Sequence, residues 1–200
     1  MVLFVRTILD DNRYELEIKN SKFIALIYKV KTKDEIKMIL ERVRKEYKDA
    51  THYCFAYIID DMVKSSDDGE PGGTAGMPIL QVLQKQELNY VLGVVVRYFG
   101  GIKLGAGGLV RAYTKSISLC LENANVRELR EGYHIILEIE YSYLKELDYL
   151  LRNSIINSKE YNNKIRYDLD VSLEMADILE KDKNIIIVKK TNKYVIDNIY

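Results

Sequence analysis

Residues 91–113, VLGVVVRYFGGIKLGAGGLVRAY, join a long apolar run to an amphipathic pattern through a series of glycines. Residues 91–99 are mostly apolar, which predicts a strand that is buried on both faces. Gly100 and Gly101 end this run, and from Gly108 onward apolar and small residues recur at helical spacing. The stretch therefore predicts a strand, a glycine loop and a helix in succession.

Cationic side chains flank this glycine loop: Lys103 lies within it, Arg97 precedes it, and Arg111 follows inside the expected helix. Free backbone N–H groups at the start of a helix favour anions, so we predict a site for a phosphate-bearing partner such as RNA. The predicted binding residues are Arg97, Gly100, Gly101, Lys103, Gly105, Gly107, Gly108 and Arg111. Alternatively, the glycines allow the strand and helix to pack closely, and the arginines neutralise nearby carboxylates.

A second glycine-rich stretch, SSDDGEPGGTAGMPIL (residues 65–80), carries three carboxylates. Its candidate site residues are Asp67, Asp68, Gly69, Glu70, Gly73, Thr74 and Gly76. Backbone N–H groups at Gly72, Gly73 and Gly76 would allow an anion such as phosphate to bind, and a tight structural turn explains the same composition equally well. Magnesium binding is less favoured, because adjacent carboxylates in loops more often lie in solvent or cap a helix. No metal site and no cofactor are predicted.

Local patterns predict the elements that precede these stretches. Residues 14–30 contain two alternating segments separated by polar residues, which predicts a hairpin. Thr32 and Glu35 have the spacing of a capping box, and apolar residues recur at helical spacing after them, so a helix is expected over about residues 33–47. Residues 52–59 are aromatic and β-branched, which predicts a strand.

A polar run, RELREG at residues 127–132, indicates a domain boundary. We predict one domain over residues 1–130 and a second over residues 133–200. The second follows the order strand, helix, strand, strand, helix, strand, which is typical of a ferredoxin-like βαββαβ fold. Its helices are expected over about residues 143–156 and 172–181. It presents no reactive cluster, so we expect an interaction or scaffold module.

The composition is that of a globular protein with no overall attraction to nucleic acid. Acidic and basic residues number 30 each among 200, so any such attraction must come from a local patch. Cys54 and Cys120 are too few for a disulfide framework or a zinc site, which favours a reducing, cytoplasmic compartment. The apolar run at the start covers only residues 2–5, far shorter than a signal-peptide core or a membrane span.

Two pairs of nearby side chains each allow two interpretations. His52 and Cys54 would lie on one face of a strand, as a nucleophile and base could, but a structural pair is favoured. Tyr98 and Phe99 could stack on bases, yet strand alternation buries one of them, and we expect Phe99 to lie in the core.

Four stretches resemble, in order, the signatures of the YigZ/Impact family. They are SKFIA (21–25), THYCFAY (51–57), SDDGEPGGTAGMPIL (66–80) and VVVRYFGGIKLGAGGLVRAY (94–113). The part of the chain after them is similar to the smaller domain that bacterial members add. The chain departs from the family at Gly72, where bacterial members often carry serine, and this departure weakens any mechanism that uses that hydroxyl.

The resemblance implies an α/β (α+β) protein with two RNA-related folds. The N-terminal domain would be similar to the second domain of ribosomal protein S-five, and the C-terminal domain similar to the last domains of elongation factor G. Both of these relatives contact RNA. Eukaryotic Impact regulates translation through a protein partner, in a pathway that bacteria lack.

We therefore predict a non-enzymatic cytoplasmic protein that binds RNA or a ribosome-associated partner in the regulation of translation. One alternative is an enzyme that acts on a phosphorylated or nucleotide-like substrate between the loop from Asp67 to Gly76 and the loop from Arg97 to Arg111. The other alternative is a protein-binding module. The sequence leaves the oligomeric state open.

Overall fold

The computed structural model describes residues 5–196 of a mixed α/β protein that divides into two compact units, residues 1–127 and 128–200. Residues 2–4 of the apolar run at the start lie outside the described residues. No described helix is both long and apolar enough to cross a membrane.

The first unit is built on a five-stranded sheet in which every neighbouring pair is antiparallel. In spatial order its strands are β2 (Asn12–Ile18), β3 (Ser21–Lys29), β6 (Val91–Tyr98), β4 (His52–Ile59) and β5 (Met62–Ser66). The predicted hairpin, the strand over residues 52–59 and the buried strand before the glycine loop are confirmed as β2 with β3, β4 and β6. Strand β5 was not predicted.

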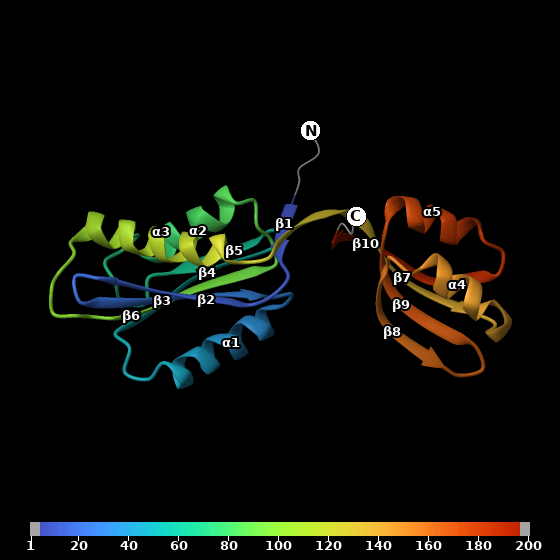
Figure 1. The fold of residues 1–200 in the computed structure, drawn as a ribbon, viewed down its shortest axis with the longest axis horizontal. Coiled ribbons are helices and arrows are strands. Elements are labelled where there is room, and N and C mark those ends of the chain that lie inside the picture. The colour runs from blue at the N-terminus through green and yellow to red at the C-terminus, as the bar shows by residue number, and fades with distance from the viewer. Residues whose placement is uncertain (1–4, 197–200) are drawn as a thin grey trace. The chain divides into compact units, whose positions relative to one another are not determined.

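Helices cover both faces of this sheet (Figure 1). Helix α1 (Lys33–Glu46) lies on one face, and helices α2 (Gly76–Lys85) and α3 (Ala106–Glu122) lie on the other. The predicted capping of α1 is confirmed, because the Thr32 hydroxyl accepts a hydrogen bond from Glu35 N at 3.2 Å. The sheet is consequently buried on two sides, as the apolar sequence of β6 requires.

Two apolar clusters hold these layers together. Ile36 and Val43 of α1 pack with Leu92 and other residues of one sheet face. Ile79 of α2 and Ile117 of α3 pack against the opposite face. Each helix therefore contributes the apolar stripe that its periodicity predicts.

The second unit follows the predicted order, with sheet order β10-β7-β9-β8. Its elements are β7 (Val126–Ile139), a 3₁₀ turn (Tyr141–Tyr143), α4 (Leu144–Leu150), β8 (Ile155–Tyr161), β9 (Ile165–Ser172), α5 (Leu173–Lys181) and β10 (Ile185–Ile196). Strand β1 (Val5–Ile8) precedes β2 in the first unit. The helix expected over residues 143–156 is shorter, since Ile155 and Ile156 pair with β9.

The polar run at residues 127–132 is not a loop but part of the continuous strand β7. Leu129 to Gly132 pair with residues of β10, and Leu129 is buried. These ladder hydrogen bonds satisfy the backbone of a segment whose side chains are mostly polar, so pairing with a distant strand overrides its local composition.

Candidate binding site at the two glycine loops

The two glycine-rich stretches meet at one end of the first unit. We call residues 67–76 the acidic loop and residues 97–111 the basic loop. The basic loop also touches the turn between β2 and β3: a side chain at Gly100 would place its Cβ 2.0 Å from Asn20 O. Only glycine fits there, so this close approach needs the residue that the sequence supplies. The basic loop lies at the left of Figure 1, between β6 and α3.

Strand register determines the position of Arg97. Arg97 of β6 pairs with Phe23 of β3 on one side and with His52 of β4 on the other, so the three side chains point to the same face of the sheet. Arg97 is only 4% exposed, and its guanidinium lies 5.3 Å from the Phe23 ring centre and 5.4 Å from that of Phe99. Such a side chain is enclosed by protein and does not extend into solvent.

A buried ion pair joins the two loops. Arg97 Nη1 donates to Glu70 Oε1 at 2.6 Å, and the same oxygen accepts a hydrogen bond from Tyr113 Oη at 2.8 Å. Arg97 Nη2 also donates to the buried Ser21 hydroxyl at 3.3 Å, which in turn accepts from Gly100 N at 3.2 Å. This network confirms the alternative in which Arg97 neutralises a carboxylate of the acidic loop.

His52 and Cys54 lie beside this network but face different partners. His52 Nδ1 is 2.8 Å from Asp68 O, whereas Cys54 Sγ is 3.0 Å from Asp67 O and 3.3 Å from Tyr113 Oη. Burial raises the pKa of the Cys54 thiol to about 12, and burial likewise raises the pKa of Tyr113. Cys54 therefore remains a protonated thiol at neutral pH, unsuited to nucleophilic attack.

Asp67 fills the anion position that the acidic loop creates. Its Oδ1 accepts from Ala75 N at 2.9 Å and Gly76 N at 2.8 Å, and its Oδ2 accepts from Gly73 N at 2.8 Å. Burial favours the neutral acid, but these three hydrogen bonds outweigh it and lower the pKa of Asp67 below its usual value. Of the two alternatives for this loop, the tight structural turn is favoured over a bound phosphate, because the chain's own carboxylate occupies the backbone donors.

The other two carboxylates of the acidic loop are also engaged by protein groups. Asp68 accepts from Arg44 Nη2 at 2.7 Å and from Tyr53 N at 2.7 Å. Glu70 is buried against Arg97. Within residues 5–196, no group of His, Cys, Asp and Glu side chains is arranged to hold a metal ion. The three carboxylates point to three different partners, as structural side chains do.

The remaining candidates of the acidic loop shape its turns. Thr74 Oγ1 donates to Pro71 O at 2.6 Å, and Glu70 N donates to Asp67 O at 3.0 Å across a turn that contains Gly69. At Gly76 an added Cβ would lie 2.6 Å from the backbone of Ser66, so this glycine permits α2 to begin against β5. The acidic loop is therefore a packed structural unit.

The basic loop, by contrast, is open. Lys103 and Arg111 are exposed, and neither forms an ion pair with any described residue. Helix α3 begins after Gly105, which has φ +70° and no side chain to cap the helix. No described side chain accepts a hydrogen bond from the backbone N–H groups of Gly107 or Gly108, which lie in the first turn. Exposed backbone donors and two cations without a described ion-pair partner thus lie close together in sequence, in the basic loop and the start of α3.

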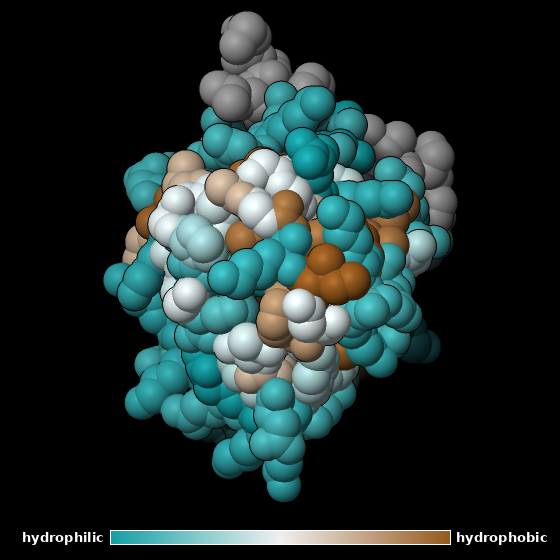
Figure 2. Space-filling view, turned by 90° about the vertical axis from the view of Figure 1, so that its left-hand side faces the viewer, coloured by the Kyte–Doolittle hydropathy of each residue, from teal (hydrophilic) through white to brown (hydrophobic). Residues whose placement is uncertain are grey.

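Apolar side chains are also exposed at this end. Phe99 is 44% exposed and Ile102 is 46% exposed, beside Gly101 of the same loop. Figure 2 shows this end of the first unit, where a pale to brown area is surrounded by hydrophilic residues. The expectation that Phe99 lies in the core is wrong. Strand β6 ends at Tyr98, which packs with the α1 cluster, and Phe99 follows in the open loop, where its side chain is exposed.

Sequence reasoning missed several residues of this end. Ser21 and Tyr113 belong to stretches quoted for the family resemblance, but nothing in their local pattern indicated contact with the Glu70–Arg97 pair. Arg44 lies in the last turn of α1, and only the structure shows that it pairs with Asp68. These partners lie far away in the chain, so spacing could not identify them.

The part of the chain that contains both loops is similar to known proteins. The Impact N-terminal domain matches residues 19–121, which include both loops and the buried ion pair. The IMPACT family member YvyE of Bacillus subtilis is 40% identical over 181 residues, covering 89% of this chain and 81% of the relative. The IMPACT family member YigZ of Escherichia coli is 39% identical over 150 residues, covering 71% and 74%.

A solved structure extends the similarity to the whole chain. The crystal structure of a hypothetical protein matches with a TM-score of 0.64 and 30% identity, covering 94% of this chain and 97% of the other. The domain match, the two curated relatives and this fold agree with the four motifs in the sequence. The chain therefore belongs to the IMPACT family.

Proposed function

We propose that this protein is a non-enzymatic cytoplasmic RNA-binding protein of the translation apparatus, and that the basic loop contacts the phosphate backbone. The observation that carries the proposal is the uncapped start of α3 beside two exposed cations, Lys103 and Arg111. Backbone N–H groups at a helix start and long cationic side chains are the donors that hold phosphate in protein–RNA contacts.

The contacts of Arg97 change its proposed role. Arg97 is buried and paired with Glu70, so it supports the basic loop from beneath and does not touch the ligand. The direct phosphate contacts are assigned to Lys103, Arg111 and the N–H groups after Gly105. Gly100 and Gly101 allow the loop to follow the β2–β3 turn before it reaches the helix.

Family likeness supports the choice of RNA over other polyanions. The family resemblance suggests that the first unit is similar to the second domain of ribosomal protein S-five and the second unit to the last domains of elongation factor G. The second unit's strand order, β10-β7-β9-β8 with helices α4 and α5, is compatible with the latter. A ribosomal or ribosome-associated RNA is accordingly the proposed ligand.

The test measures affinity for a single-stranded RNA oligonucleotide at several salt concentrations. Each phosphate contact contributes roughly 0.7 to the slope of log affinity against log salt. The double variant Lys103→Ala/Arg111→Ala is expected to bind more weakly and to lose a slope of about 1.4. The control Lys85→Ala removes one exposed charge at the last residue of α2, outside the basic loop.

An unchanged slope in the double variant, or a loss of similar size in the control, would remove the basic loop from the proposal. An absence of RNA binding by the unmodified protein would remove RNA itself. Exposed surface residues rarely change stability by more than about 0.5 kcal/mol, so a folded double variant is expected.

Phe99 and Ile102 favour a second candidate function, in which this end of the molecule recognises a protein. Exposed aromatic and aliphatic side chains beside cations are common at protein interfaces. Capture of a protein that persists after nuclease treatment, and that Phe99→Ser abolishes, would support this candidate over RNA. The enzyme alternative gains no support from the acidic loop, whose three carboxylates are all engaged by protein donors.

A further inference from the structure

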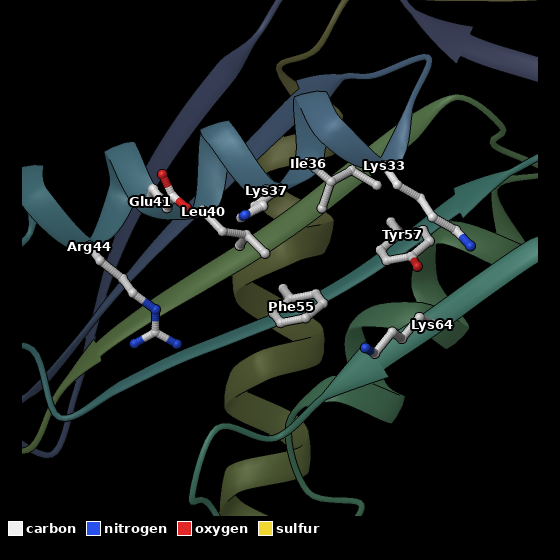
Figure 3. Close-up of a pocket in the computed structure, with 9 residues that line it drawn as sticks. All are labelled: Lys33, Ile36, Lys37, Leu40, Glu41, Arg44, Phe55, Tyr57 and Lys64. Carbon is white, nitrogen blue, oxygen red and sulfur yellow. The ribbon is translucent and has the colours of Figure 1, made fainter.

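One face of the first unit's sheet carries a single helix, and this leaves a groove. Helix α1 covers part of the five strands, while α2 and α3 share the opposite face. Beside α1, above β4 and β5, lies a groove of about 270 Å³ (Figure 3). It is lined by Lys33, Ile36, Lys37, Leu40, Glu41, Arg44, Phe55, Tyr57 and Lys64. All of these residues belong to the first unit, and none is part of the basic loop.

The groove has an apolar floor. Ile36 and Leu40 project from α1, and Phe55 and Tyr57 project from β4 toward them, as Figure 3 shows. Cross-strand pairing places Lys64 of β5 next to Tyr57, at the outer side of this floor. A concave apolar surface between a helix and a sheet edge is the kind of site that receives side chains of a partner.

The rim of the groove is cationic. Lys33, Lys37, Arg44 and Lys64 surround the floor, against the single carboxylate of Glu41. Among residues 5–196, no carboxylate forms an ion pair with Lys33, Lys37 or Lys64. Arg44 differs, because it is bound to Asp68 and lies 4.5 Å from the ring centre of Tyr53, so it closes one end. Three unpaired lysines around an apolar floor favour a ligand that is both acidic and apolar.

Size and shape indicate a peptide. Pockets for whole small ligands usually enclose roughly 300–1,000 Å³, so this groove is suited to a few side chains of a larger molecule. Its lining on α1 runs from Lys33 to Arg44, a length of about 16 Å at the rise of an α-helix. RNA fits less well, since Tyr57 is only 8% exposed and does not present a ring face on which a base could stack.

We propose that this groove docks an acidic peptide segment of a partner protein. Apolar side chains of the segment pack on Leu40 and Phe55, and its carboxylates pair with Lys33, Lys37 and Lys64. The charge of the rim selects the partner and the apolar floor supplies the buried contact. No residue that lines the groove belongs to the basic loop, so this inference does not depend on RNA binding.

The test uses a panel of fluorescently labelled acidic peptides of about 12 residues, with Leu or Phe at helical or alternating spacing and Glu between them. Fluorescence anisotropy with the full chain measures their affinity. The charge reversal Lys37→Glu/Lys64→Glu is expected to weaken binding by about tenfold or more. Lys85→Glu, which reverses one charge on α2 outside the groove, is expected to leave the affinity unchanged. All three lysines are exposed, so the variants retain the fold.

A second measurement reverses the charge of the peptide as well as that of the groove. Peptides with Lys in place of Glu should bind the reversed variant better than they bind the unmodified protein. The proposal is overturned if no acidic peptide of the panel binds, or if the two reversed variants bind alike. It is also overturned if a 12-nucleotide RNA, in place of the peptides, is the ligand whose affinity depends on Lys37 and Lys64.

Discussion

Helices α2 and α3 both start from a glycine-rich loop at the same end of the first unit, yet their starts differ in chemistry. The start of α2 holds the carboxylate of Asp67, which accepts hydrogen bonds from Gly73, Ala75 and Gly76. The start of α3 follows Gly105, and no side chain of residues 5–196 caps it. Both glycine loops lead into helix starts with free backbone N–H groups. At α2 the chain's own carboxylate accepts from them, and at α3 no described side chain does.

The difference between the loops depends on one buried contact that spans them. Glu70 of the acidic loop and Arg97 of the basic loop form an ion pair that is almost excluded from solvent. Their opposite charges neutralise each other inside the molecule, so neither residue contributes to the surface charge. The remaining cations of the basic loop, Lys103 and Arg111, are exposed and supply its surface charge. The buried pair stabilises the arrangement and the exposed pair is available for binding.

Removing one partner of the buried Glu70–Arg97 pair should lower the free energy of unfolding most. Arg97→Met leaves Glu70 buried without its counter-charge, and the loss in free energy of unfolding is expected to be about 3–5 kcal/mol. Urea denaturation followed by circular dichroism measures it. In the double variant Glu70→Gln/Arg97→Met the carboxylate is gone as well, so the loss should be smaller than for Arg97→Met alone. A loss below about 1 kcal/mol in the single variant would show that the pair does not hold the loops together.

Removing the Asp67 carboxylate from the start of α2 should cause the next largest loss of stability. Asp67→Ala removes the acceptor of three backbone N–H groups, and the expected loss is about 2 kcal/mol. The matched control is Asp61→Ala, because Asp61 is an exposed acidic residue in the turn before β5. If both substitutions cost the same, the carboxylate of Asp67 does not act as the cap.

The same carboxylate should make stability depend on pH. The pKa of Asp67 in the folded protein lies below its usual value, so the unfolded chain binds the proton more tightly. Its contribution is complete above the unfolded pKa of about 3.9 and is lost as pH falls through the lower folded pKa. Denaturation at a series of pH values should show a smaller acid loss for Asp67→Asn than for the unmodified protein. Equal acid losses would assign the pH dependence to other groups.

The smallest changes in stability are expected for substitutions at the start of α3. Gly105 has φ +70°, so Gly105→Ala should cost about 1 kcal/mol although nothing lies within 4 Å of the added Cβ. Gly107→Ala adds the same methyl group inside the helix and should stabilise by about 0.5 kcal/mol. Thermal denaturation of the two variants compares them. Shifts of the same sign would mean that backbone conformation does not control this position.

Local chemistry explains which elements were predicted correctly. The cap at Thr32, the helical stripe through Ile36 and Val43, and the apolar run of β6 depend on residues within a few positions of one another. Strand β5 was missed because Lys64, Ser65 and Ser66 have weak strand character, and it forms through pairing with β4. The length of β7 was missed for the same reason, because its polar half depends on β10.

The sequence by itself determined the strand, glycine loop and helix of residues 91–113, the family, and the identity of the charged groups at the two loops. Only the tertiary structure decided how those charges pair. Glu70 meets Arg97 across 27 residues, and Arg44 meets Asp68 across 24. Such distances carry no periodic signal, and strand register and burial select the partners. Burial thereby separated Arg97 from the exposed Lys103 and Arg111, three cations that look equivalent in the sequence.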